Sequence, residues 1–282
     1  MKLIRLTIIM LLAFGTIISK AQDTLKVKNI AAILYLGSGT NQPLIVGLGG
    51  SEGGNAWASD HWETTRNQFI AKGYAFLAIG YFGAKNTPAT LDQIAIEDVY
   101  QAITLAVQQQ KINRAKIAVV GGSRGADLAL LLGSYYPAIT CVVGLSASNV
   151  AFPGHTQTFD SSCWTFAGKQ LPFVPVNEEA VPFLMKGDLR GGFTAMLKDT
   201  VAAQRSVIKV ENINGPILLL SATKDEVIPA VAMGDAMMLR LKANQFKHVN
   251  RHLIFEGKHA EPTKHFTEVF EFLDRNFLKN TE

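Results

Sequence analysis

The sequence predicts an α/β fold, with a mostly parallel sheet covered by helices on both faces and a cap inserted between two strands. Two observations along the 282-residue chain support this prediction. Short apolar runs alternate with segments whose apolar residues have helical spacing, which is typical of βαβ units and a parallel sheet. One long stretch, residues 147–213, breaks that alternation. A content of 48% hydrophobic and 18% charged residues excludes an intrinsically disordered chain.

The predicted strands and helices follow one another along the whole domain. A turn at 37–41 separates the first two strands, and Gly73 ends the first helix. Within 92–110, Ile96, Val99 and Ile103 lie at helical spacing. Strands are predicted at 33–36, 44–48, 74–79, 116–120, 139–145, 216–220 and 249–255, and helices at 60–72, 92–110, 124–135, 230–242 and 263–278.

Residues 147–213 differ in composition from the rest of the chain. They hold prolines and aromatic residues without strand–helix alternation, among them Pro153, Pro172, Phe159, Trp164 and Phe183. Long insertions of this kind in compact domains are usually functional lids. We therefore expect a cap whose aromatic residues supply an apolar pocket; the alternative is a packing decoration on one edge of the sheet.

The first 21 residues have the layout of a secretory signal peptide. A basic start precedes an apolar run over 6–18, and Ser19 and Ala21 are small residues at −3 and −1 of a cleavage site. The run is shorter than the about 20 residues that span a bilayer. We expect cleavage after Ala21, no stable membrane span after it, and an exported, periplasmic or extracellular domain over 22–282. The alternative is a retained N-terminal membrane anchor.

The charge balance gives no sign of a nucleic-acid partner. Residues 1–21 hold three of the 27 basic residues and no acidic residue, so their removal lowers the formal net charge from +4 to +1. The remaining basic residues form no run that would follow a phosphate backbone, which excludes nucleic acid. Two cysteines, Cys141 and Cys163, are too few for a disulfide scaffold or a Cys-rich zinc module. We expect both to be unpaired, although export would permit a disulfide.

A G-x-S-x-G pattern centred on Ser123 is the sharpest chemical signal. An apolar strand precedes Gly121 and an apolar helix follows Gly125, which is the strand–turn–helix arrangement of a nucleophile elbow. The glycines are needed because the serine lies on a tight, strained turn. The alternative is an ordinary glycine-rich turn with an N-capping serine.

A serine nucleophile needs a base and an orienting carboxylate, in the chain order Ser, Asp or Glu, His. His259 follows the last predicted strand, and Asp225 follows the strand at 216–220. Glu226 is the rival carboxylate. The other downstream histidines lie in the cap, in a strand or in a helix: His155, His248, His252 and His265. The alternatives are an exposed loop histidine and an aspartate that only stabilises a turn.

Two backbone amides are expected to form an oxyanion hole. One is the amide of Arg124, directly after the nucleophile, and the other lies in the glycine-rich loop 49–54, at Gly50 or Ser51. A phosphate-binding loop would need G-K-[ST] or G-x-G-x-x-G spacing, which this loop lacks. We expect no cofactor and no metal, because no His/Cys/Asp cluster has ligand spacing.

Taken together, these motifs resemble an α/β-hydrolase, and more narrowly the catalytic domain shared by acyl-CoA thioesterases and bile acid-CoA:amino acid N-acyltransferases. The resemblance covers roughly residues 30–279 and rests on the motifs at 48–54, 73–83, 121–125, 145–150 and 257–262. It implies a triad of Ser123, Asp225 and His259. The N-acyltransferase members use a cysteine nucleophile, so a serine here favours hydrolysis over transfer to an amine.

The expected function is that of a serine hydrolase acting on a small-molecule acyl ester or thioester through an acyl-enzyme. A carboxylester and a thioester fit equally well. Two alternatives stay open: a peptidase or amidase with the same triad, and a catalytically silent α/β-hydrolase-fold binding protein.

Overall fold

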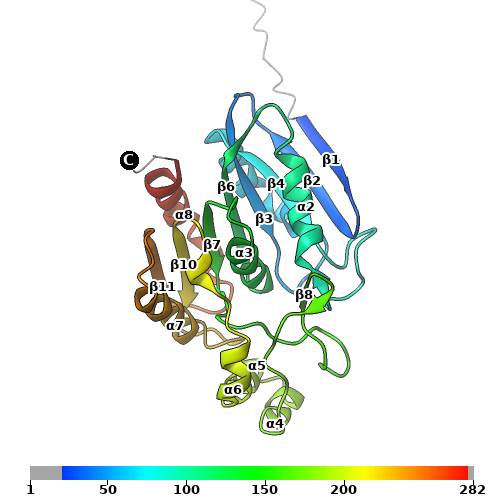
Figure 1. The fold of residues 1–282 in the computed structure, drawn as a ribbon, viewed down its shortest axis with the longest axis vertical. Coiled ribbons are helices and arrows are strands. Elements are labelled where there is room, and N and C mark those ends of the chain that lie inside the picture. The colour runs from blue at the N-terminus through cyan, green and yellow to red at the C-terminus, as the bar shows by residue number, and fades with distance from the viewer. Residues whose placement is uncertain (1–20, 279–282) are drawn as a thin grey trace, which may run out of the picture.

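The computed structural model describes residues 21–278 (Figure 1). The predicted signal peptide, residues 1–21, therefore lies outside the described residues except for Ala21. Within 21–278, none of the helices is both long and apolar enough to cross a membrane. The same residues contain no group of three or more His, Cys, Asp or Glu side chains that could hold a metal ion.

A twisted sheet of eight strands forms the centre of the molecule, in the order β1-β2-β4-β3-β6-β7-β10-β11. The strand β2 pairs antiparallel with β1 and with β4, and all other neighbours are parallel. This confirms the mostly parallel sheet predicted from the sequence. The strands are β1 (Ala21–Val27), β2 (Ile30–Leu36), β3 (Gln42–Leu48), β4 (Ala75–Gly80), β6 (Ile112–Gly122), β7 (Cys141–Leu145), β10 (Ile217–Ala222) and β11 (Asn250–Phe255).

Helices cover both faces of this sheet, as Figure 1 shows. Alternate side chains of one strand enter different cores: Leu44 and Val46 pack on one face and Ile45 on the other. The helices α2 (Ile96–Ala106), α3 (Arg124–Tyr135) and α7 (Ala230–Ala243) contribute to the first core. The helices α1 (Glu63–Ala71) and α8 (Phe266–Leu273) contribute to the second. Both faces are apolar because both are buried.

The edge strand β1 was not predicted from the sequence. Its residues 22–27 are mostly polar, and Leu25 is the buried apolar side chain among them. The strand forms because Lys28 and Asn29 turn the chain back on β2, with Asn29 at a positive φ of 61°. Pairing with β2, rather than an apolar run, therefore defines β1.

Three predicted helices are shorter in the structure. The segment predicted at 60–72 begins as a 3-10 turn (Asp60–Trp62), and α1 ends at Ala71. The segment predicted at 92–110 begins as the short strand β5 (Ile94–Ala95) before α2. The segment predicted at 263–278 consists of a 3-10 turn (Glu261–Lys264), α8, and one π-helical turn (Asp274–Leu278). Periodicity alone does not separate such turns from the helices that they extend.

The inserted segment 147–213 packs in two places. Its first part adds β8 (Trp164–Phe166) and β9 (Lys169–Gln170) to β5, and Trp164 is buried in the main core. Its second part forms α4 (Val181–Met185), α5 (Leu189–Met196) and α6 (Thr200–Arg205), which lie together at the lower end of the molecule in Figure 1.

A separate small apolar core joins the insertion to the rest of the domain. Phe152, Val174 and Met196 pack there with Ile228 and Met233, which belong to the segment around the start of α7. The insertion is thereby fixed to the end of the sheet where β10 finishes.

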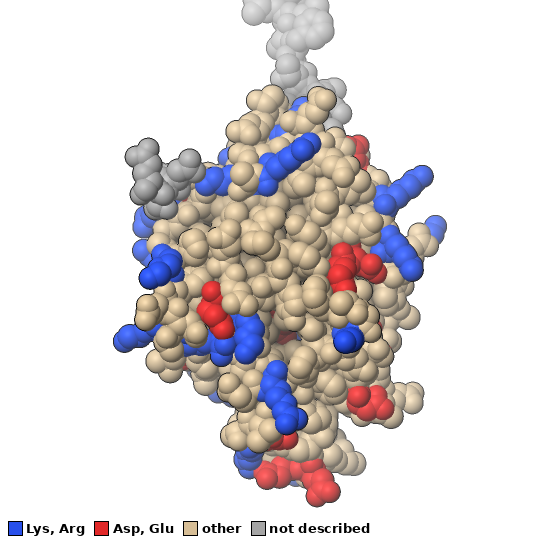
Figure 2. Space-filling model, in the orientation of Figure 1, with Lys and Arg blue, Asp and Glu red and all other residues tan. Residues whose placement is uncertain are grey.

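Charged side chains are scattered over the surface, and Figure 2 shows no large patch of one sign on the face in view. Most of that face is formed by uncharged residues. The surface in view therefore offers no extended anion-binding strip.

Candidate active site

Ser123 lies on a sharp turn between β6 and α3. Its backbone has φ 52° and ψ −122°, a conformation that non-glycine residues rarely adopt. The two flanking glycines have no room for a side chain: a Cβ on Gly121 would lie 2.0 Å from the Gly125 carbonyl oxygen, and one on Gly125 would lie 2.2 Å from the Gly49 carbonyl oxygen. The turn therefore has the geometry of a nucleophile elbow.

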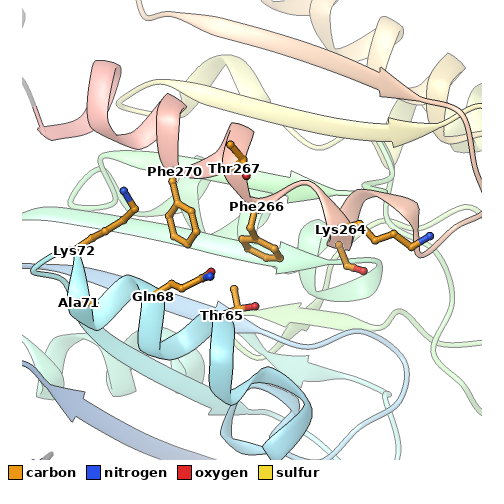
Figure 3. A pocket seen from close by; sticks show the side chains of 9 residues that line it. Thr65, Gln68, Ala71, Lys72, Lys264, Phe266, Thr267 and Phe270 are labelled. Carbon is orange, nitrogen blue, oxygen red and sulfur yellow. The ribbon is translucent and has the colours of Figure 1, made fainter.

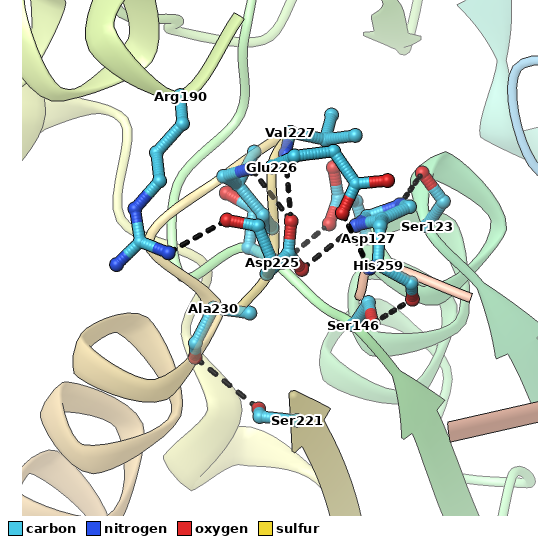
Figure 4. A network of polar contacts seen from close by, with 12 residues as sticks. Ser123, Asp127, Ser146, Arg190, Ser221, Asp225, Glu226, Val227, Ala230 and His259 are labelled. Atoms are coloured by element: carbon cyan, nitrogen blue, oxygen red, sulfur yellow. Dashed lines mark hydrogen bonds and ion pairs between the residues drawn. The ribbon is translucent and has the colours of Figure 1, made fainter. Parts of the chain in front are cut away.

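Three residues predicted from the sequence meet at the carboxyl ends of the parallel strands (Figure 4). His259 Nε2 lies 2.9 Å from Ser123 Oγ, and His259 Nδ1 lies 2.8 Å from Asp225 Oδ2. Because the carboxylate accepts from Nδ1–H, a neutral imidazole has its free lone pair on Nε2, facing the serine hydroxyl. This arrangement can withdraw the proton of Ser123.

Asp225 is completely buried and firmly held. Its Oδ1 accepts from the amides of Val227 at 2.8 Å and Ile228 at 3.0 Å, which leaves Oδ2 for His259. Arg190, from α5 of the insertion, donates to the Asp225 carbonyl oxygen at 2.6 Å. The insertion thus supports the loop that bears the carboxylate.

Both the backbone amide and the carbonyl oxygen of His259 are hydrogen-bonded. Its amide donates to Glu226 Oε2 at 2.9 Å, and its carbonyl oxygen accepts from Ser146 Oγ at 2.7 Å. The hydrogen bond from the His259 amide lowers the pKa of Glu226. Glu226, considered as the rival of Asp225, therefore holds the histidine loop rather than the imidazole.

The expected oxyanion donors have different surroundings. Arg124 is the first residue of α3, where a backbone N–H has no partner within the helix. The amide of Gly50 donates instead to Glu52 Oε1 at 3.0 Å. Gly50 is nevertheless next to the nucleophile, since a Cβ there would lie 3.1 Å from Ser123 Cβ. For Gly50 to donate to a substrate oxygen, the Glu52 carboxylate must move aside.

A cavity of about 970 Å³ opens beside Ser123 and His259. Its walls are mainly apolar, and many come from the insertion, including Val181, Leu184 and Phe193. Ligand pockets of this size usually combine such walls with a few polar groups.

The polar part of the cavity includes an ion pair that sequence reasoning missed. Arg124 Nη1 lies 3.1 Å from Asp127 Oδ2, and Asp127 Oδ1 accepts from the Ser148 amide at 2.8 Å. Burial raises the pKa of Asp127 to about 6, although the charge of Arg124 opposes that shift. The sequence signal for this ion pair is the i,i+3 spacing of Arg124 and Asp127 on the helix after the elbow.

A second Ser–His–Asp chain exists elsewhere in the molecule. His252 Nε2 lies 2.9 Å from Ser221 Oγ, and His252 Nδ1 lies 3.0 Å from Asp235 Oδ1. Here the histidine is buried, with 4% of its side chain exposed, and the aspartate is 60% exposed, the reverse of the arrangement at Ser123. Ser221 donates to the Ala230 carbonyl oxygen, well away from Ser123 in Figure 4. This chain therefore ties β10, β11 and α7 together.

A smaller cavity of about 490 Å³ lies between α1 and α8 (Figure 3). Gln68 from α1 and Lys72, directly after α1, face Phe266 and Phe270 from α8 across it. Among the residues described there, none is a His, Cys, Asp or Glu. The residues that line it therefore include no pair of a histidine and a carboxylate.

Both cysteines are free and buried. Burial raises the pKa of both thiols, that of Cys163 to about 12. Neither has the lowered pKa of a nucleophilic thiolate.

Comparisons with known proteins show the family and the fold of the chain. Residues 94–262 match the family model described as "BAAT / Acyl-CoA thioester hydrolase C terminal". The chain is 25% identical over 185 residues to human acyl-coenzyme A thioesterase 1, which covers 65% of this chain and 40% of that protein. It is 33% identical over 85 residues to human acyl-coenzyme A thioesterase 6, a match that covers 29% of this chain and 20% of that protein. It thus spans less than half of either relative.

Solved structures show the same fold at low identity. An esterase of Pyrococcus furiosus superposes with a TM-score of 0.60 at 16% identity, covering 92% of both chains. An acylaminoacyl peptidase of Pyrococcus horikoshii gives 0.66 at 13% identity, covering 93% of this chain and 42% of that one. Since the family model matches more than half of the chain, the protein belongs to the BAAT/acyl-CoA thioester hydrolase family and has the α/β-hydrolase fold.

Proposed function

We propose that the protein is a serine hydrolase that cleaves an ester or thioester bond of an acyl substrate. The observation that supports this most strongly is the hydrogen-bonded chain from Ser123 through His259 to Asp225, which opens onto a largely apolar cavity. A serine hydroxyl is a weak nucleophile unless a base removes its proton, and this chain supplies the base and its orienting carboxylate.

The first half-reaction forms an acyl-enzyme. His259 Nε2 takes the proton of Ser123 as Oγ attacks the acyl carbonyl carbon, and Asp225 stabilises the imidazolium. The Arg124 amide and a donor of the Gly50–Ser51 loop bind the oxyanion, at about 2.7–4 kcal/mol for each donor. The tetrahedral intermediate collapses, and His259 gives its proton to the leaving alcohol or thiol.

The second half-reaction reverses these roles with water. His259 removes a proton from water, the resulting hydroxide attacks the acyl carbon, and the bond to Ser123 Oγ breaks as Oγ regains a proton. The apolar side chains of the insertion hold the acyl chain during both steps.

Export is part of the proposal. Residues 1–21 have the basic, apolar and small-residue regions of a signal peptide, with cleavage after Ala21. The intact mass of the protein recovered outside the cytoplasm should correspond to residues 22–282. A mass that includes residues 1–21 would contradict cleavage.

Turnover by two matched serine variants tests the hydrolase directly. Ser123→Ala should abolish hydrolysis of aryl esters and acyl-CoA thioesters, while Ser221→Ala, which alters the second Ser–His–Asp chain, should retain it. Acyl-peptides complete the substrate panel. Hydrolysis of amides but not esters would favour a peptidase or amidase, and no hydrolysis at all would favour a binding protein. Unchanged turnover in Ser123→Ala would overturn the mechanism.

A further inference from the structure

The apolar cavity beside Ser123 has a charged corner at Arg124. The Arg124 side chain lines the cavity and is 8% exposed. Its Cζ lies 5.1 Å from the ring centroid of Phe152 and 5.3 Å from that of Phe193. Contacts with two aromatic rings restrict the guanidinium, so that the N–H groups at its edges remain for hydrogen bonding.

Most of those N–H groups have no partner in the protein. Among residues 21–278, the side chain of Arg124 makes one hydrogen bond, from Nη1 to Asp127 Oδ2 at 3.1 Å. A guanidinium has five N–H donors, and a single bond to one carboxylate oxygen leaves most of them unused. The other oxygen of Asp127 accepts from the Ser148 amide, so Arg124 and Asp127 do not form a two-oxygen, bidentate pair. An oxygen of a ligand in the cavity can accept from these free N–H groups.

We propose that Arg124 determines specificity by binding a carboxylate at the far end of the substrate's acyl chain, an inference that rests on the proposed function. Arg124 is the one Lys or Arg among the described residues that line the cavity. The planar guanidinium matches a carboxylate through two parallel hydrogen bonds. Apolar walls, including Leu184 and Met196, would contact the methylene groups between the carboxylate and the reacting carbonyl.

His155 lines the same cavity without competing for this role. Burial, together with the charge of Arg124, lowers the pKa of His155 to about 4. The imidazole is therefore neutral near pH 7 and adds no positive charge. Arg124 remains the cation that a carboxylate would meet.

Asp127 makes the preference depend on pH. The charges of Arg124 and His259 lower the pKa of the Asp127 carboxyl. The charge of Asp127 in turn raises the pKa of Tyr81 and of Cys163. With the pKa of Asp127 raised to about 6, acidification below that value removes the negative charge that offsets Arg124. A substrate carboxylate, with an ordinary pKa of about 4.3, stays ionised over most of that range. Binding of the carboxylate should therefore strengthen as the pH falls through 6.

Matched p-nitrophenyl esters test the inference. The three acyl groups have equal length and differ at one end: hexanoate, 5-oxohexanoate with a neutral carbonyl, and the half-ester of adipate with a carboxylate. The ratio of kcat/KM for adipate to that for hexanoate is measured in the wild type and in Arg124→Met, Arg124→Lys and Asp127→Asn. Taking the ratio within one enzyme removes effects on the triad and on the fraction of folded protein.

The wild type should prefer adipate, and Arg124→Met should lower the ratio at least tenfold, with Arg124→Lys in between. The wild-type ratio should rise between pH 7 and pH 5.5, whereas Asp127→Asn should have the high ratio throughout. A ratio that is equal in wild type and Arg124→Met would overturn the inference, as would an Arg124-dependent preference for 5-oxohexanoate alone. Absence of hydrolysis of all three esters would instead contradict the proposed function.

Discussion

The carboxylate of Glu52 accepts a hydrogen bond from the amide of Gly50 at 3.0 Å, inside the loop that borders Ser123. A negative charge therefore lies where a substrate oxyanion would compete for the same donor. Like charges repel, and a developing oxyanion is more stable when the neighbouring group is neutral. We therefore expect Glu52 to slow the proposed hydrolysis.

Neutralising Glu52 should accelerate hydrolysis of neutral esters. We expect Glu52→Gln to raise kcat/KM about threefold to tenfold, or about 0.7–1.4 kcal/mol, because the amide removes the charge and keeps the size of the side chain. Glu63→Gln, an exposed change on α1, is the control and should have no effect. A decrease in Glu52→Gln would mean that the carboxylate assists catalysis.

Asp225 and Glu226 are adjacent carboxylates with different roles. Asp225→Asn should lower kcat by about 10⁴-fold, because an amide does not stabilise the imidazolium or fix the productive tautomer of His259. Glu226→Gln should stay within about tenfold of wild type, since its amide oxygen can still accept from the His259 backbone. Equal losses in the two variants would contradict the assignment of Asp225. Initial-rate kinetics on one aryl ester are sufficient.

The Ser221–His252–Asp235 chain should affect stability rather than turnover. Ser221→Ala leaves a ring nitrogen of the buried His252 without its partner, which costs about 1–3 kcal/mol in the free energy of unfolding. Urea unfolding would measure this loss, and the folded variant should hydrolyse esters at the wild-type rate. Loss of turnover in folded Ser221→Ala would show that this chain takes part in catalysis.

Asp127 should make the protein less stable as the pH rises through about 6. Its folded-state pKa is raised from 3.8 to about 6, so the folded state binds the proton more tightly than the unfolded state. The stabilisation is present below pH 4 and is lost above pH 6, an effect of about 3 kcal/mol at about 1.4 kcal/mol for each pH unit. The free energy of unfolding of Asp127→Asn should lack this component.

The difference in unfolding free energy between wild type and Asp127→Asn also cancels the contributions of other titrating groups. Glu211 and Glu226 have lowered pKa values, so they contribute stability that is lost on acidification, in the opposite direction. Both variants retain these groups, and the difference between their pH profiles isolates Asp127. Parallel profiles between pH 4 and 7 would contradict the raised pKa.

The residues brought together at Ser123 were predictable because each follows a strand. Ser123, Asp225 and His259 come after β6, β10 and β11, and parallel strands place such positions at one edge of the sheet. The glycines around Ser123 gave a second signal. Backbone oxygens lie about 2 Å from where a Cβ would stand on Gly121 or Gly125, so only glycine fits at these two positions. Strand order and turn chemistry were thus enough for these three positions.

Other features depend on contacts that a sequence does not display. The edge strand β1 has too few apolar residues to be recognised and forms through pairing with β2. The bond from Gly50 to Glu52 depends on the path of one loop. The contact of Arg124 with the rings of Phe152 and Phe193 depends on how the insertion packs against α3. Such side-chain contacts arise only once distant segments have packed.

The most direct test of the central claim is the site of covalent labelling by a fluorophosphonate. Such a probe reacts with a serine that a neighbouring base activates. Mass spectrometry of digested, labelled protein should find the phosphonate on Ser123, with labelling lost in Ser123→Ala and retained in Ser221→Ala. Labelling on Ser221, or folded wild-type protein that takes up no label, would contradict the account.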